Sequence, residues 1–248
     1  MAPGLPALYR TLTPLDRTRH RDWYLDPDHG YRFAAGAQVL PLAAIEFPPA
    51  ARDFPIVFLS RDDGTVAPVA LLGLRPGRNA VVDAQGRWTG RYLPAYLRRY
   101  PFMPVPDAAA QDRYTVCIDE TYSGFNTVAE GAKLLDERGE AGPAVRQCLE
   151  FLEEYHRQTQ ATAAFCAAVV AADLLEPMQA TVKLGDGETF ALNGFLCATR
   201  ARIKALTATQ VHALVAQEYL ELLYLHLHSL ANVDKLAANH GPARASGG

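Results

Sequence analysis

The sequence lacks the cysteine patterns that most often point to a function. Its 248 residues include only four cysteines. They are widely spaced and form no C-x-x-C pair, which excludes the usual spacings of zinc sites and dithiol redox centres. Each lies among apolar neighbours, so we expect buried, reduced thiols. The four are Cys117, Cys148, Cys166 and Cys197.

A strong excess of charge is also missing. The formal net charge is −3, from 24 basic and 27 acidic side chains. The most basic segment, Arg17 to Arg21 with His20 inside it, is short and interrupted, and we expect it to be solvated. Proteins that bind nucleic acid present a basic face or stripe. The composition therefore predicts no nucleic-acid partner.

Long apolar runs are absent as well. No segment reaches the roughly 18 uninterrupted apolar residues of a transmembrane helix. The N-terminus has no apolar core of the length that a signal peptide requires. We therefore expect no transmembrane segment and a cytoplasmic location, with any association with the cell envelope made through a partner.

The familiar catalytic signatures are missing too. There is no G-x-S-x-G elbow, no phosphate-binding glycine loop, no H-E-x-x-H and no dinucleotide-binding fingerprint. Their absence weighs against an ordinary hydrolase, kinase or dehydrogenase. Because convergent sites carry no motif, the sequence leaves open whether the protein is an enzyme.

The patterns that are present predict an α+β fold. Four short strand-like segments follow one another within residues 39–82, and their connections are too short for the crossover helices of a parallel sheet. Apolar spacing predicts one helix over 143–175 and another over 208–238, which opens with Thr207 and Gln210 in the spacing of a capping box. We expect an N-terminal antiparallel sheet packed against two long C-terminal helices.

Two shorter features complete the predicted fold. A small hairpin, turning at Gly185-Asp186-Gly187, is inserted between the two helices. Residues 104–113 are expected to form a loop, and the segment from Tyr114 to Glu120 a further strand.

The chain divides into three predicted parts. Residues 1–30, rich in Pro, Arg, Asp and His, are expected to form an extended N-terminal arm, with ordered secondary structure beginning near Tyr31. Residues 31–238 form one domain, which is sheet-rich over 31–122 and helix-rich over 123–238. Residues 239–248 are expected to be a disordered tail.

The segment from Asn79 to Phe102 is the most informative part of the chain. Asp83-Ala84-Gln85-Gly86 predicts a turn, from which Trp88 returns on a second strand. Pro94 suits the first turn of a short helix, which the next proline, Pro101, brings to an end.

Aromatic side chains near proline and arginine form a candidate binding surface, since such mixtures are enriched in recognition sites for proteins and peptides. The alternative is that they belong to the packing between sheet and helices. Arg98 and Arg99 point about 100° apart on a helix, cannot both face one ligand, and are expected to be surface residues. The candidate binding residues are Trp23, Trp88, Tyr92 and Arg98.

His226 is the candidate for chemistry. It shares a helix face with Ser229 and Val233, so the favoured interpretation is a core histidine bonded to a backbone or carboxylate partner. Two histidines and one carboxylate would match the facial site of non-haem iron enzymes, with His20 and Glu46 as the other ligands. No spacing brings these three together, and a lone Glu46 is usually half exposed or paired with arginine. We expect no cofactor, with iron as the alternative.

Four segments of the chain together resemble the SapC family of bacterial proteins, over about residues 20–236. The family is associated by name with surface-layer loci of Gram-negative bacteria. Its members also resemble proteins whose genes lie next to those of outer-membrane receptors and flavin halogenases. The resemblance implies an accessory protein that acts on a protein or peptide partner, and it assigns no catalytic residue. The alternative is a metal-dependent enzyme that modifies a peptide or small molecule. The segments are Pro41 to Phe58, Asn79 to Phe102, Cys117-Ile118-Asp119, and the last-helix residues His226, Ser229, Leu230 and Asn232.

Overall fold

A five-stranded antiparallel sheet with the order β10-β13-β4-β5-β3 lies at the centre of the larger part of the molecule. β4 and β5 form a hairpin, and β13 pairs with the other side of β4 through Leu196 opposite Phe58. The strands are β3 (Val39–Pro41), β4 (Ile56–Ser60), β5 (Val66–Leu71), β10 (Leu175–Pro177) and β13 (Leu196–Ala198). The computed structural model describes residues 6–26, 28–106, 114–183 and 188–238.

The predicted antiparallel sheet is confirmed for three of the four expected strands, but the fourth, at 79–82, is wrong. Only an isolated bridge between Val82 and Trp88 forms there. The reason is local, because the Asn79 side chain accepts the Val81 N–H at 2.8 Å and donates to the Ala34 carbonyl at 3.0 Å. A side chain that bonds the backbone in this way competes with a strand ladder.

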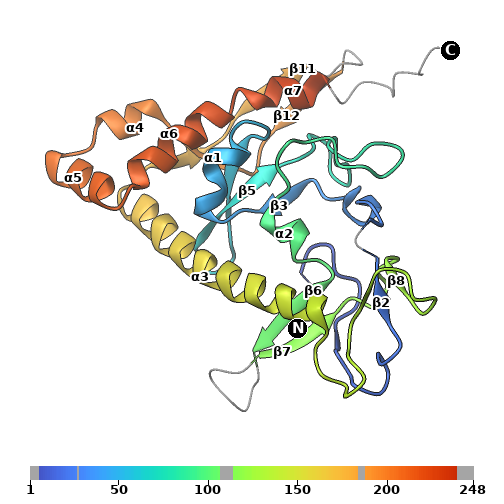
Figure 1. Ribbon diagram of the computed structural model, residues 1–248. Helices are drawn as coiled ribbons and strands as arrows, with labels where there is room; N and C mark the ends of the chain where they lie inside the picture. The colour runs from blue at the N-terminus through green and yellow to red at the C-terminus, as the bar shows by residue number, and fades with distance from the viewer. Residues whose placement is uncertain (1–5, 27, 107–113, 184–187, 239–248) are drawn as a thin grey trace.

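Two small sheets form the other end of the molecule and draw in the N-terminal segment (Figure 1). One has the order β1-β7-β6 and the other the order β8-β2-β9. Ordered secondary structure therefore begins well before Tyr31. The loop expected over 104–113 begins as a strand, because β6 occupies 102–106. Residues 107–113 lie outside the described residues. The strands are β1 (Thr13–Pro14), β2 (Tyr24–Leu25), β6 (Phe102–Pro106), β7 (Tyr114–Ile118), β8 (Phe125–Asn126) and β9 (Ala132–Lys133).

The helix α3 (Pro143–Ala171) runs diagonally along both parts of the molecule (Figure 1). Its first half buries Val145 and Leu152 in the smaller core cluster, beside the N-terminal sheets. Its second half buries Phe165 and Val169 in the main core cluster. One helix therefore contributes side chains to both of these clusters.

The predicted helix over 208–238 is broken into three, α5 (Ala208–Ala216), α6 (Tyr219–Ser229) and α7 (Asn232–Ala238). The predicted capping box is confirmed, since Gln210 N donates to the Thr207 hydroxyl and Thr207 N donates to the Gln210 side chain. The first break comes at Glu218, which adopts the left-handed conformation with φ 59°, and the second separates Ser229 from Asn232. Residues other than glycine rarely adopt this conformation, and the apolar spacing of the sequence does not predict a break at Glu218.

The remaining elements are short. The hairpin of β11 (Ala180–Lys183) and β12 (Thr189–Leu192) confirms the predicted insertion, although its turn at 185–187 lies outside the described residues, as does the predicted tail. Among the described residues, no helix has the length and apolar character of a membrane span. The other helices are η1 (Arg32–Ala34), η2 (Ala44–Glu46), α1 (Phe47–Ala50), α2 (Ala95–Arg98) and α4 (Arg200–Lys204).

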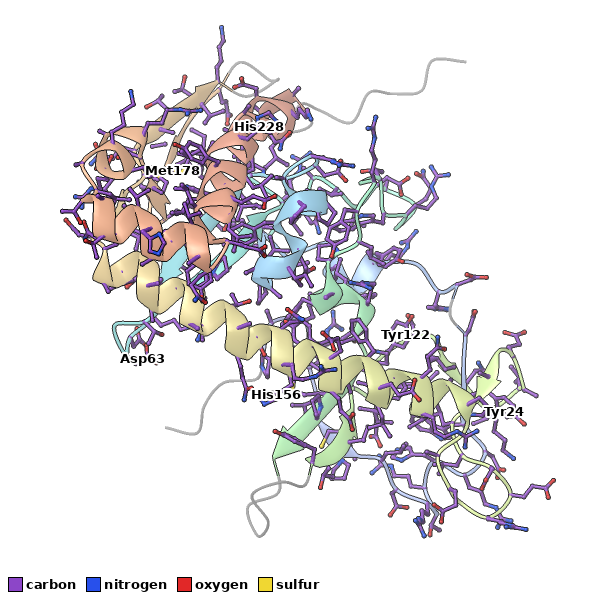
Figure 2. The ribbon with its side chains drawn as sticks, turned by 60° about the vertical axis from the view of Figure 1, so that its left-hand side comes forward. Tyr24, Asp63, Tyr122, His156, Met178 and His228 are labelled. Carbon is purple, nitrogen blue, oxygen red and sulfur yellow. The ribbon has the colours of Figure 1, made fainter. Side chains whose placement is uncertain are left out.

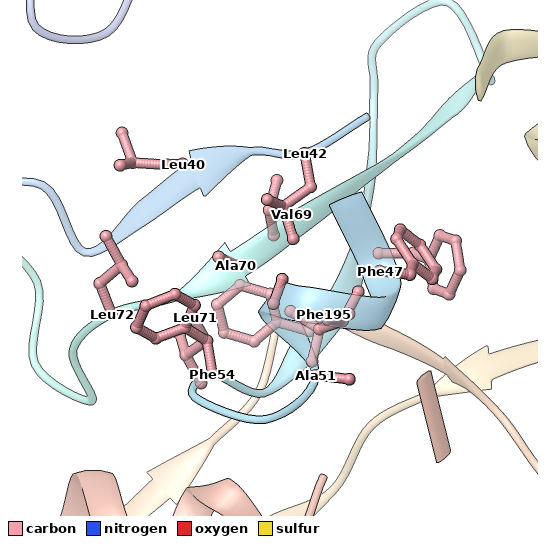
Figure 3. Close-up of a cluster of buried hydrophobic side chains, with 14 of the residues drawn as sticks. Leu40, Leu42, Phe47, Ala51, Phe54, Val69, Ala70, Leu71, Leu72 and Phe195 are labelled. Carbon is pink, nitrogen blue, oxygen red and sulfur yellow. The ribbon is translucent and has the colours of Figure 1, made fainter. Parts of the chain in front are cut away.

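The main core lies between the central sheet and the helices α3 and α6, which contact its strands. Figure 3 shows part of this core around Phe47, Phe54 and Leu71. Phe47, Phe54 and Phe58 are fully buried there, beside Leu71 of β5. Each fully buried side chain of this size contributes about 2 to 3 kcal/mol through its removal from water. The predicted α+β class is therefore confirmed, with the sheet as its centre and helices on its sides.

Candidate functional site

A pocket of about 440 Å³ lies where α2 and the first half of α3 meet the N-terminal sheets. This volume is in the range of small-molecule and side-chain binding sites. Figure 2 shows Tyr122 on the side of the molecule along which α3 runs. The lining includes six aromatic rings: Tyr31, Phe33, Tyr100, Phe102, Tyr122 and Phe151.

One face of α3 forms a wall of the pocket. Ala144, Gln147, Cys148 and Phe151 line it, and they are spaced as i, i+3, i+4 and i+7. Side chains at these spacings share one face of a helix. The sequence carries this signal, but the apolar pattern of the helix could not separate pocket-facing from core-facing residues.

Stacked aromatic rings form the opposite wall. Phe33 and Tyr100 lie nearly parallel with ring centroids 4.2 Å apart, and Tyr122 meets Tyr100 edge-on at 5.2 Å. Tyr100 is 9% exposed. Packing between these rings therefore holds the wall together.

The predicted turn at Asp83–Gly86 holds this wall in place. Tyr31 N donates to the Gly86 carbonyl at 2.7 Å, which ties the pocket segment to the turn. Gly86 has φ +84°, and a Cβ there would lie 2.3 Å from the Arg32 side chain. The positive φ of the turn therefore favours glycine at this position.

Three of the four candidate binding residues gather at this site. Arg98 lines the pocket, and Trp88 contacts the ring of Tyr31 with centroids 6.0 Å apart. The Trp88 indole also donates to the Tyr92 carbonyl at 2.9 Å. Trp88 and Tyr92 are half-buried and support the wall without lining it.

Trp23, the fourth candidate, lies elsewhere. Its ring meets His20 edge-on, with centroids 4.7 Å apart, and tilts against Phe125 at 5.4 Å. It is half-buried against the smaller core cluster. The structure therefore does not bring Trp23 to the pocket.

The two adjacent arginines have opposite environments. Arg98 is exposed at the pocket, whereas Arg99 is 9% exposed and lies among the rings of Tyr9, Tyr96 and Tyr155. Its guanidinium carbon is 4.0 Å from the Tyr96 ring centroid. The expectation of a surface Arg99 is wrong because three aromatic faces replace water around the cation.

Glu46 is a buried anchor behind the pocket. It is 3% exposed, so the expectation of a half-exposed or arginine-paired residue is wrong. Its carboxylate accepts from Ala43 N at 2.8 Å, from Ala95 N at 2.7 Å and from the Tyr92 hydroxyl at 2.9 Å. Three donors satisfy the buried charge and fasten α2, which carries Arg98, to η2.

His226 is a core residue, as favoured by its helix face. Its Nε2 accepts from Ala198 N at 3.0 Å, so Nδ1 carries the proton and donates to the Ile56 carbonyl at 2.7 Å. Burial lowers the pKa of His226 to about 4, against the smaller opposing effect of these two backbone bonds. The neutral imidazole thus links α6 to β4 and to β13.

His20 is buried as well, although a solvated segment was expected around it. Its Nδ1 accepts from Asp16 N at 2.8 Å, so Nε2 donates to Glu120 at 2.8 Å. Among the described residues, no group of three or more His, Cys, Asp or Glu side chains could hold a metal ion. The structure therefore does not bring His20, Glu46 and His226 together.

The stability of the fold should depend on pH through His226. Its pKa is about 4 when folded and 6.5 as an ordinary histidine, so only the unfolded chain takes up this proton between these values. The unfolded state binds more protons there, and stability falls as the pH falls from 6.5 to 4, by about 3 kcal/mol. Denaturant unfolding across this range would measure the loss.

Two variants isolate the contribution of His226 to this pH dependence. His226→Gln should remove it, whereas His228→Gln, at an exposed position of the same helix, should retain it. Equal pH dependence in wild type and His226→Gln would contradict the assignment.

The fold and the pocket together define a class of protein. It is an α+β protein with a pocket of aromatic side chains where α2 and the first half of α3 meet the two small N-terminal sheets. The SapC family model matches residues 15–236, and the chain belongs to this family. No curated protein and no solved structure matches the chain.

Proposed function

We propose that this SapC-family protein is an accessory protein that binds a segment of a protein or peptide in the aromatic pocket. The pocket is the single observation that carries the proposal, because aromatic residues and arginine are enriched where proteins recognise one another. The family's association by name with surface-layer and outer-membrane receptor loci suggests the partner's setting. Any contact with the cell envelope is then made through that partner.

Binding is proposed in preference to metal chemistry because of how the polar side chains are used. Glu46, His20 and His226 have each of their side-chain nitrogen or oxygen atoms in a hydrogen bond. Burial raises the pKa of Cys148, the thiol in the pocket, to about 12, so it stays protonated and a poor nucleophile. What the pocket offers a ligand is shape, ring faces and one cation.

Ala144→Trp should strongly weaken peptide binding, because the indole would occupy the pocket from α3. Random linear peptides displayed on phage and selected on the wild-type protein provide the ligands. We expect the enriched peptides to bind wild type at micromolar or tighter dissociation constants and the variant at least 50-fold more weakly. Titration of each synthetic peptide by calorimetry measures the difference.

Ala161→Trp is the matched control, since Ala161 is exposed on the same helix and does not line the pocket. It should leave peptide affinity within twofold of wild type. Circular dichroism and thermal unfolding check that both variants fold. If no peptide is enriched, or if the enriched peptides bind Ala144→Trp as well as wild type, the proposed function is wrong.

A further inference from the structure

The pocket carries one cation, the guanidinium of Arg98, which also lies beside the Tyr92 hydroxyl that donates to Glu46. Among the described residues that line it, Arg98 is the one with a formal charge at neutral pH. No described carboxylate lies within ion-pair distance of its guanidinium, which stands 5.1 Å from the ring centroid of Phe151. Arginine does not lose its proton in proteins. The charge is therefore permanent and faces both the pocket and solvent.

The other ionisable groups of the lining are neutral at physiological pH. Burial raises the pKa of Tyr122 to about 12, and it raises the pKa of Tyr100 further, with an added effect from Asp119. Burial also raises the pKa of Tyr31. The rings thus offer apolar faces and uncharged hydroxyls, and Arg98 determines the sign of charge that the pocket attracts.

A carboxylate lies near the wall of the pocket that Tyr122 forms. Asp26 lies 3.6 Å from His29, whose ring meets that of Tyr122 edge-on with centroids 6.1 Å apart. An anion should therefore prefer the Arg98 side of the pocket to this wall.

We infer that the pocket takes a carboxylate attached to a large apolar group, with the carboxylate on the Arg98 guanidinium and the apolar group among the rings. This inference rests on the proposed function of the pocket. A free C-terminus that ends in an aromatic residue has this chemistry, and so does a free aromatic carboxylic acid. Both match one guanidinium beside an apolar space large enough for one side chain.

Removing the charge of the ligand's carboxylate, or that of Arg98, tests the inference. The probes are N-acetylphenylalanine and an octapeptide ending in phenylalanine, each as the free acid and as the C-terminal amide. Ligand-detected NMR titration measures the dissociation constants. We expect wild type to bind each acid at least tenfold more tightly than its amide, and the difference to shrink in high salt.

Variants of Arg98 show whether this residue is responsible. Arg98→Met keeps the aliphatic stem without the charge and should bring acid and amide to within twofold of each other. Arg98→Lys should retain a preference for the acid. Arg200→Met is the control, since Arg200 is also exposed and stands over a ring, that of Tyr224 at 5.9 Å, away from the pocket. It should bind like wild type.

The outcomes separate the inference from the function it rests on. Equal affinity of acid and amide for wild type overturns the carboxylate assignment, and so does a preference for the acid that is unchanged in Arg98→Met. If the binding of phage-selected peptides is still weakened by Ala144→Trp, the proposed binding function stands without that assignment. An octapeptide acid that binds at least tenfold more tightly than N-acetylphenylalanine assigns a peptide C-terminus. Equal affinity of these two acids assigns a small carboxylic acid and overturns the peptide part of the function.

Discussion

Glu46→Ala is expected to lower the free energy of unfolding by about 4 kcal/mol. The substitution leaves two backbone N–H groups, of Ala43 and Ala95, and the Tyr92 hydroxyl without their common acceptor. Each buried donor left unpaired costs about 1 to 3 kcal/mol, and more where the lost partner was charged. Guanidinium denaturation of wild type and variant, followed by far-UV circular dichroism, measures the difference.

The control for this prediction is Glu153→Ala, an exposed glutamate on α3. It should change the unfolding free energy by less than about 0.5 kcal/mol, as surface substitutions usually do. A loss below about 1 kcal/mol in Glu46→Ala would show that the carboxylate is not the anchor of α2. The variant should also weaken any ligand that depends on Arg98, because α2 carries that residue.

Asp119→Ala is expected to cost about 3 kcal/mol and to release the N-terminal segment. The fully buried carboxylate accepts from Arg10 N at 2.7 Å, from the Thr11 hydroxyl at 2.9 Å and from the Thr121 hydroxyl at 2.7 Å. Burial alone would raise the pKa of Asp119, but these hydrogen bonds together hold it below its ordinary value. The donors are partly buried, so water offsets part of the loss.

Hydrogen exchange distinguishes local release from general destabilisation. The amides of Arg10 and Thr11 should lose protection in Asp119→Ala by a larger factor than amides of β4, far from the site. Asp62→Ala, at an exposed aspartate, should change neither. Uniform loss of protection across the chain would contradict a specific attachment of residues 10 and 11 to Asp119.

Features determined by a few neighbouring residues could be predicted from the sequence. The capping box at Thr207 and Gln210 needs only residues three positions apart, and it forms as expected. The turn at Asp83–Gly86 also follows from local chemistry, since Asp83 accepts from Gln85 N and Gly86 supplies the positive φ. The break at Glu218 was missed because no glycine or proline marks it.

Features determined by distant residues could not be predicted in this way. His20 meets Glu120 across 100 positions, and Glu46 meets Ala95 across 49, so no local spacing reveals either pair. The pocket could not be predicted from local spacing either. Its segment from 79 to 102 stood out by composition, but the facing wall comes from α3, whose residues look like those of any amphipathic helix.

The order of strands in the central sheet also bears on how the chain is made. β4 has β5 beside it within a few residues, but its other neighbour, β13, begins at residue 196 of 248. A ribosome synthesises the chain from the N-terminus, so one edge of β4, with Ile56 and Phe58, stays open through most of synthesis. An open apolar edge is a template for pairing with another chain. We therefore expect β4 to be open to pairing with another chain until β13 has been synthesised.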